Sequence, residues 1–197
     1  MTQHERLDTA LKKNNGILRT SAVVEMGISK PVFYDYVKSK DLKQAAHGIY
    51  VSDDSWTDTL YLLHLRYGQL VFSHETALFF HDLTDREPFP YSATVKRGYN
   101  ASGLKGEGVL VYTVKKELHG IGATSMKTPF GHLVPVYDME RTICDLIRSR
   151  NHIEMQTYQD ALKQYARRKD KNLRNLMNYA QMFRVEKILR QYLEMLL

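Results

Sequence analysis

The chain has 197 residues, a formal net charge of +6 at neutral pH, and 43% hydrophobic residues. No apolar run approaches the roughly 18 residues that span a bilayer, and residues 1–6 lack the apolar core of a signal peptide. We therefore expect a cytoplasmic protein with no membrane partner, and the basic charge balance favours an anionic partner.

Three helices are expected in the first forty residues. Residues 2–13 predict the first, because a hydroxyl and a carboxylate three residues apart at its start form a capping box. A second, short helix begins at Thr20 or Ser21 and ends at Gly27, a residue suited to a left-handed cap. Ser29 then caps a third helix. This order predicts a helix-turn-helix, in which the last helix can lie in a major groove of DNA.

The third helix separates into two faces. Apolar side chains form one stripe, whereas Lys30, Tyr34 and Lys38 recur every four residues on the other face, with Ser29 at its start. The lysines suit phosphates or guanine edges, and Tyr34 can bond a phosphate or stack on a base. A solvated face of a small helical subdomain is the alternative interpretation.

Residues 42–51 predict a β-hairpin that turns at His47 and Gly48. A hairpin directly after a recognition helix is a wing, and it completes a winged helix-turn-helix over residues 1–53 that binds double-stranded DNA. Further candidate DNA contacts are Lys40, Lys43 and His47 near the wing, and Arg19, Thr20 and Ser21 at the start of the second helix, where free amides favour a phosphate.

Residues 54–197 predict a larger mixed α/β domain, so the fold class is α+β. Residues 53–55 resemble a linker or a helix cap. Helices are expected over 56–67 and after a cap at Ser73, strands over 91–95, 108–114, 124–128 and 132–137, and helices through the last third. Pro135 favours an edge strand. The glycine-rich residues 98–108 favour a mobile hairpin tip.

The chain contains no recognisable catalytic motif. The glycine-rich stretch lacks the ending of a phosphate-binding loop, and Cys144 lies in an apolar helical pattern typical of a buried structural thiol. His74 and His81, which are two helical turns apart, favour packed and hydrogen-bonded roles. We therefore expect no enzyme activity, no cofactor and no metal site.

Three segments together resemble the AbiEi family of antitoxins, from bacterial abortive-infection (type IV) toxin–antitoxin systems. They are the start of the chain through Gly48-Ile49-Tyr50, residues 73–85, and Val136-Tyr137-Asp138-Met139-Glu140-Arg141-Thr142-Ile143-Cys144-Asp145-Leu146-Ile147, which is the most specific. The similarity extends over essentially the whole chain.

The resemblance implies an antitoxin that represses its own operon by binding inverted repeats in operator DNA. It also implies that the C-terminal domain neutralises a nucleotidyltransferase-type toxin without a stable complex. The protein is then expected to be a monomer in solution that binds DNA cooperatively.

Two other functions remain open from the residues alone: a ligand-responsive transcriptional repressor, and a nucleic-acid-processing enzyme that is targeted by its winged helix. A possible second basic surface comprises Arg148, Arg150, Arg167, Arg168, Lys169, Lys171 and Arg174. It could contact DNA, an RNA or the toxin, or it could be a solvated helical face.

Overall fold

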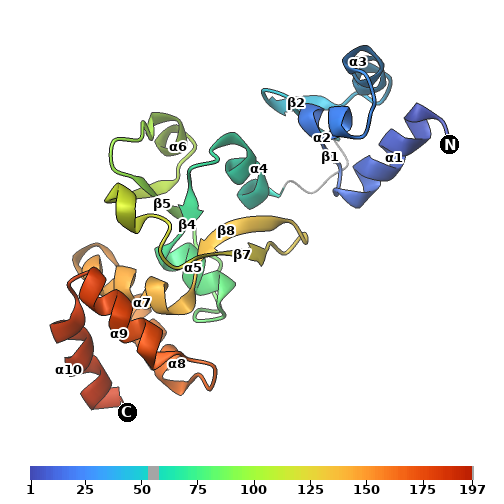
Figure 1. Ribbon diagram of the computed structural model, residues 1–197. Coiled ribbons are helices and arrows are strands. Elements are labelled where there is room, and N and C mark those ends of the chain that lie inside the picture. Colours follow the sequence, from blue (N-terminus) through green and yellow to red (C-terminus); the bar gives the residue numbers. More distant parts are fainter. Residues whose placement is uncertain (53–57, 197) are drawn as a thin grey trace. The chain divides into compact units, whose positions relative to one another are not determined.

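The structure is a computed structural model that describes residues 1–52 and 58–196, and it mixes helices with two β-sheets (Figure 1). The chain divides into two compact units. Unit 1 consists of Met1–Gly68 together with Lys127–His132, and unit 2 consists of Gln69–Met126 together with the chain from Leu133 onward. The expected α+β class is confirmed.

Unit 1 combines short helices with a small antiparallel sheet. Its elements are α1 (Gln3–Lys13), β1 (Ile17–Arg19), α2 (Thr20–Glu25), α3 (Lys30–Ser39), β2 (Lys43–Ala46), β3 (Ile49–Val51) and α4 (Thr59–Arg66). Helix α1 begins at the expected capping box. The Glu5 amide donates to the Thr2 hydroxyl at 3.2 Å, and the Thr2 amide donates to the Glu5 carboxylate at 2.8 Å.

A tight turn joins α2 to α3. Gly27 has a φ of +77°, and Ile28 is buried in the core of unit 1. The expected cap of α2 at Thr20 or Ser21 is wrong, because Arg19 holds the N-cap position with an extended backbone and Thr20 is already helical. Ser29 is the N-cap residue of α3 as expected, although its side chain makes no capping bond.

Strands β2 and β3 form a hairpin directly after α3, and Gly48 turns with a φ of +69°. The register shifts between Gln44 and Ala46, so this hairpin contains a bulge. Strand β1 pairs antiparallel with β3 and completes a sheet of order β1-β3-β2. The sequence pattern did not predict β1, which has only three residues and falls between two helices.

Unit 1 continues beyond the expected boundary at residue 53. Residues 53–57, where the linker and the start of the helix over 56–67 were expected, lie outside the described residues. Helix α4 packs Leu62 against Ile17 and Ile49. The Asp58 carboxylate accepts hydrogen bonds from the Thr128 hydroxyl at 2.6 Å and bonds the His132 ring at 2.7 Å, so residues 127–132 also belong to this unit.

Unit 2 is built on a five-stranded sheet of order β6-β5-β4-β8-β7. Its elements are β4 (Val71–Phe72), α5 (His74–Phe80), β5 (Ser92–Lys96), α6 (Ser102–Gly106), β6 (Leu110–Val114), the 3-10 helix η1 (Lys116–Leu118), β7 (Ala123–Lys127), β8 (Leu133–Tyr137), α7 (Met139–Arg148), the 3-10 helix η2 (Arg150–His152), α8 (Met155–Arg167), α9 (Leu173–Met182) and α10 (Glu186–Leu196).

Two local expectations for this sheet are wrong. Pro135 does not lie in an edge strand, because β8 is placed between β4 and β7; β4 pairs with β8 only at Phe72 and Val136, so little of the ladder is lost. Residues 98–108 are not a hairpin tip. Strands β5 and β6 run parallel, which requires a crossover, and this crossover contains α6 with Leu104 buried.

The helical last third of the chain packs around α7, which contacts α5, α8, α9 and α10 (Figure 1). Asp138 caps α7 as expected by accepting a hydrogen bond from the Arg141 amide at 2.7 Å. Every residue from Met139 to Ile147 is buried, including the charged ones. Within the described ranges, no helix has the length and apolar character needed to cross a membrane.

Candidate nucleic-acid interface

Helix α3 presents three of the candidate DNA-binding residues on one exposed face. Lys30, Tyr34 and Lys38 are exposed, whereas Phe33 and Tyr36 are buried in the core of unit 1. The buried side chains fix the rotation of the helix, because a turn of the helix about its axis would expose both aromatic rings. The result is a face with two cations separated by one aromatic side chain.

The hairpin lies against the same helix. The ring of Tyr50 in β3 packs edge-on against Phe33 with 5.4 Å between centroids, and its centroid is 6.2 Å from that of Tyr34. Burial and the neighbouring Tyr34 hydroxyl raise the pKa of Tyr50. These aromatic contacts hold the hairpin beside the exposed face of α3.

A hollow of about 610 Å³ brings five of the candidate residues together. They are Arg19, Thr20, Ser21, Lys30 and His47, which come from β1, α2, α3 and the turn between β2 and β3. Glu25 lines the same hollow, so its charge is not uniformly positive. Residues that are up to 28 positions apart in the sequence (19 to 47) therefore line one hollow at the start of α2 and the tip of the hairpin, together with the apolar side chains of Val24, Ile49 and Leu65.

The start of α2 is less open to a phosphate than expected. The Thr20 amide already donates to the Gly48 carbonyl at 2.8 Å, and the Thr20 hydroxyl is buried without a hydrogen-bond partner. The helix itself has only six residues. Arg19 and Ser21 remain exposed, so these two side chains, rather than the helix terminus, are the groups that could contact a ligand.

The other lysines near the hairpin differ in their surroundings. Lys40 forms an ion pair with Asp8, with 2.8 Å between Nζ and Oδ1, and its ammonium lies 5.8 Å from the centre of the Tyr36 ring. The Lys40 ammonium lowers the pKa of Asp8. Lys43 and Ser29 are exposed. Lys40 is thus partly neutralised within unit 1.

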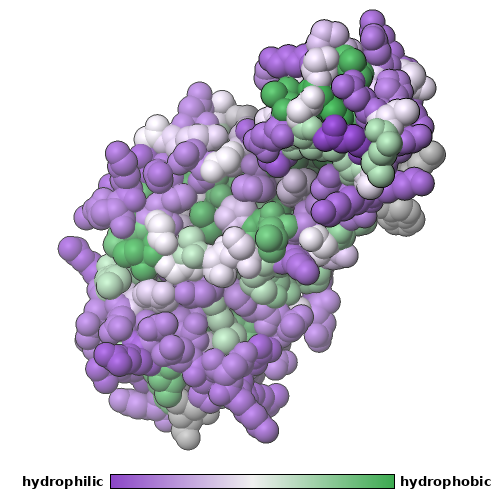
Figure 2. All heavy atoms as spheres, turned by 45° about the vertical axis from the view of Figure 1, so that its right-hand side comes forward, coloured by the Kyte–Doolittle hydropathy of each residue, from purple (hydrophilic) through white to green (hydrophobic). Residues whose placement is uncertain are grey.

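Figure 2 shows a predominantly hydrophilic surface on the viewed face, where hydrophobic residues form small separated groups. In unit 1 the exposed large hydrophobic residues include Val24 and Tyr34. Polar and ionic contacts would therefore carry binding at this surface, as they do at interfaces with nucleic acid.

The residues of the possible second basic surface differ in how far they are bound within unit 2. Four of its residues have local partners in unit 2. Arg148 lies beside Asp145, Arg150 donates to the Ile147 carbonyl, Arg168 forms a two-pronged ion pair with Asp170, and Lys171 donates to the carbonyls of Ala166 and Arg168. Arg167, Lys169 and Arg174 are exposed around the α8–α9 connection. Arg150 and Lys171 thus bond backbone carbonyls at the C-terminal ends of α7 and α8.

The segment that carries the family resemblance most specifically is buried. Arg141 is 0% exposed; its guanidinium donates to the carbonyls of Leu118 and Ile121 at 3.0 and 2.7 Å and lies 4.0 Å and 3.9 Å from the centres of the Tyr137 and Phe183 rings. Glu140 accepts a hydrogen bond from the Asn172 amide at 2.7 Å. These charged residues organise the interior of unit 2.

In unit 2, His74, His81 and Cys144 have the packed roles expected of them. His74 is fully buried between the hydroxyls of Ser73 and Ser149, at 2.9 and 3.1 Å, and burial lowers its pKa to about 4. The His81 ring bonds the Tyr137 carbonyl at 2.7 Å. Burial raises the pKa of the Cys144 thiol to about 12, so it is not a reactive thiolate.

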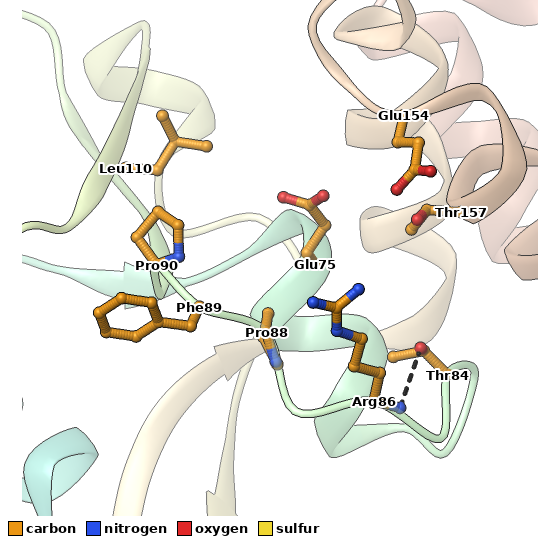
Figure 3. Close-up of a pocket in the computed structure, with 9 residues that line it drawn as sticks. All are labelled: Glu75, Thr84, Arg86, Pro88, Phe89, Pro90, Leu110, Glu154 and Thr157. Atoms are coloured by element: carbon orange, nitrogen blue, oxygen red, sulfur yellow. Dashed lines mark hydrogen bonds between the residues drawn. The ribbon is translucent and has the colours of Figure 1, made fainter.

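Unit 2 has a pocket of about 260 Å³ between α5 and the start of α8. Figure 3 shows Glu75 and Arg86 projecting into it from one side, and Glu154 and Thr157 on the other. Burial, and then the charge of Glu154, raise the pKa of Glu75. No serine, cysteine or histidine lines this pocket, and the described parts of the chain contain no cluster of three or more residues that could hold a metal ion.

The chain matches no protein-family model and no curated protein. A solved structure with a similar fold is the crystal structure of RV2827C protein from Mycobacterium tuberculosis. It has a TM-score of 0.59 and 12% sequence identity, and the match covers 92% of this chain and 72% of that one. At this identity the likeness concerns the fold alone.

Proposed function

We propose that unit 1 contains a winged helix-turn-helix that binds operator DNA. The exposed Lys30, Tyr34 and Lys38 face of α3, with the hairpin packed beside it, is the observation that carries this proposal. The left-handed backbone of Gly27, in the short turn between α2 and α3, supports the helix-turn-helix part of the proposal. In this arrangement α3 enters the major groove and the hairpin lies along the neighbouring backbone.

We further propose that the protein is an antitoxin of the AbiEi type, which represses its own operon and neutralises a nucleotidyltransferase-type toxin. The DNA-binding half of this proposal is supported by the exposed face of α3 that carries Lys30, Tyr34 and Lys38. The antitoxin half is supported by the order of the three segments that resemble the family. The two halves therefore need separate tests.

DNA binding is tested with the full chain and the duplex DNA upstream of its own gene, by fluorescence anisotropy over a series of salt concentrations. Replacing Lys30 and Lys38 by alanine removes two counterion-releasing contacts, so the slope of log affinity against log salt should fall by about 2. A Lys163→Ala, Lys187→Ala variant is the control, because it changes the net charge equally at exposed positions of unit 2. Unchanged affinity and slope in the α3 variant would remove this face from the interface.

Antitoxin activity is tested by co-expressing the full chain with the nucleotidyltransferase-type toxin that this proposal places in the same operon. The wild-type protein should restore growth. The Lys30→Ala, Lys38→Ala variant should also restore growth, since both substitutions lie on a solvent-exposed face and leave the fold intact. A toxin that remains lethal in the presence of the full chain would exclude the antitoxin role and leave the DNA-binding proposal untouched.

A further inference from the structure

Four cationic side chains surround a hollow of about 330 Å³ in unit 2. They are Arg97, Lys115, Arg148 and Arg184, and the only carboxylate among the lining residues is that of Glu117. In the described chain, the side chains of Arg97, Lys115 and Arg184 form no ion pair or hydrogen bond, and all three residues are exposed. This hollow therefore has a large excess of positive charge that the fold does not use.

The first two cations lie at the carboxyl ends of parallel strands. Arg97 directly follows β5 and Lys115 directly follows β6, and the two strands end side by side at the pair Lys96 and Val114. The Arg97 amide donates to the Val114 carbonyl at 2.8 Å, which holds the two ends together. In mostly parallel α/β sheets, ligands bind outside the carboxyl ends of the strands, and β5 and β6 form a parallel pair of this kind within a mixed sheet.

The third cation is held in place from the interior. The Arg148 guanidinium lies 3.5 Å from Asp145 Oδ1 and 5.7 Å from the centre of the Phe183 ring. Asp145 already accepts a hydrogen bond from Arg141 at 2.9 Å. One carboxylate thus lies between two guanidiniums, and Arg148 keeps a net positive field toward the hollow.

The fourth cation has an unusual backbone. Arg184 lies between α9 and α10 with a φ of +59°, a left-handed conformation that favours glycine or asparagine. An arginine at this position is strained, and its side chain has no structural partner that would compensate within the described residues. Backbone strain of this kind clusters at ligand-binding and active sites.

The hollow also has an apolar side. Met182 lines it and is 50% exposed, and the half-buried Leu118 lies beside it. We propose that this hollow binds a nucleotide: the cations hold its phosphates, and Met182 covers the base or sugar. Its volume is at the lower end of the range for small-ligand sites, which suits one nucleotide.

The proposal is tested by calorimetric titration of the full chain with ATP, with inorganic tripolyphosphate as a probe that has the charges but no nucleoside. An Arg97→Gln, Lys115→Gln variant should weaken ATP binding by about tenfold or more, since two charge-assisted contacts are lost. A Lys169→Gln, Arg174→Gln variant, with the same change in net charge on exposed residues, should bind ATP as the wild type does.

Two further variants separate a ligand contact from a structural role. Arg184→Gly should raise the thermal unfolding midpoint, because glycine accepts the left-handed backbone, and yet weaken ATP binding. Met182→Ala should weaken binding of ATP but not of tripolyphosphate. The proposal is overturned if ATP shows no saturable binding at millimolar concentration, if the control variant loses as much affinity, or if tripolyphosphate binds as tightly as ATP. Tighter binding of a single-stranded dodecanucleotide than of ATP would also overturn it and would identify a nucleic-acid surface.

Discussion

Arg141 and Asp145, one turn apart in α7, form an ion pair with 2.9 Å between Nε and Oδ2, and neither side chain is exposed to solvent. The same guanidinium lies against the rings of Tyr137 and Phe183. It therefore joins the end of β8, the turn after α9 and the centre of α7. This buried ion pair therefore connects three elements in the interior of unit 2.

Breaking this pair should destabilise the protein strongly. Asp145→Ala leaves a buried arginine without its carboxylate, so we expect the free energy of unfolding to fall by about 3–5 kcal/mol. Chemical denaturation measures this loss. Asp170→Ala removes the carboxylate of a solvent-exposed pair and should cost far less. Similar small losses for both variants would contradict the role of the buried pair.

Gly122 should not tolerate a side chain. A Cβ at this position would lie 2.7 Å from Arg141 Cβ, and the backbone has a φ of +74°. Gly122→Ala therefore combines a clash with backbone strain, and we expect a loss of about 2 kcal/mol or more in the free energy of unfolding. Gly131→Ala provides the control, since it has a similar φ of +86° but no neighbour within 4 Å. Equal losses at the two positions would attribute the effect to backbone strain alone.

The stability of the protein should depend on pH through His74. Its pKa falls from 6.5 to about 4 because the ring is fully buried, a larger effect than the opposing field of Asp145. A lowered pKa means that this contribution to stability is present above pH 6.5 and is lost as the pH falls toward 4. At about 1.4 kcal/mol per pKa unit, the loss is about 3 kcal/mol.

A His74→Gln variant isolates this effect, because it keeps a polar group for Ser73 and Ser149 but does not titrate. The difference in unfolding free energy between wild type and variant should shift by about 3 kcal/mol in favour of the variant between pH 7 and pH 4. Other titrating groups, including Glu75, cancel in the difference. A difference that stays constant over this range would show that His74 is not held neutral.

Asp8 should moderate DNA binding, if unit 1 binds DNA as proposed. Its carboxylate pairs with Lys40 and accepts a hydrogen bond from the Tyr36 hydroxyl at 2.8 Å. Asp8→Asn releases Lys40 and removes one negative charge, so we expect tighter DNA binding and a steeper salt dependence. Anisotropy titrations measure both. Asp160→Asn makes an equal change of charge on an exposed residue of α8 and should leave DNA binding unchanged. Weaker DNA binding by the Asp8→Asn variant would contradict this prediction.

Leu62 should matter to the stability of the N-terminal unit. It is 6% exposed and packs with Ile17 and Ile49. Leu62→Ala should cost about 2–5 kcal/mol, as for other buried leucines. Leu173→Ala, at a residue that is 39% exposed, should cost much less. If Leu62→Ala left the stability unchanged, a unit ending near residue 53 would be a better description than one that continues through Gly68.

The features that were predictable from sequence are local ones. The caps at Thr2 and Asp138 were expected correctly because the bonds join residues three apart. The two faces of α3 follow from helical periodicity. The buried state of Cys144 follows from the apolar residues around it. In each case the physical cause lies within about two helical turns of the residue.

The features that were missed depend on distant residues. The contact between Asp58 and His132 joins positions that are 74 residues apart, and no local sequence pattern predicts it. The parallel pairing of β5 and β6, which placed a helix where a hairpin tip was expected, is likewise a property of the whole sheet. Arg97, Lys115 and Arg184 were not grouped with Arg148 for the same reason, since they come together only at the ends of separate elements.

The discontinuity of unit 1 has a consequence for the order of events on the ribosome. The segment Lys127–His132 completes this unit through Asp58, but synthesis of residues 69–132 must come first. At typical rates of translation those residues take roughly 3–13 s. Until then, with less than two thirds of the chain made, Asp58 can cap α4 through the Tyr61 amide but cannot bond Thr128 or His132. Unit 1 would therefore be completed late in synthesis, although α3, the helix proposed to contact DNA, is among the first segments made.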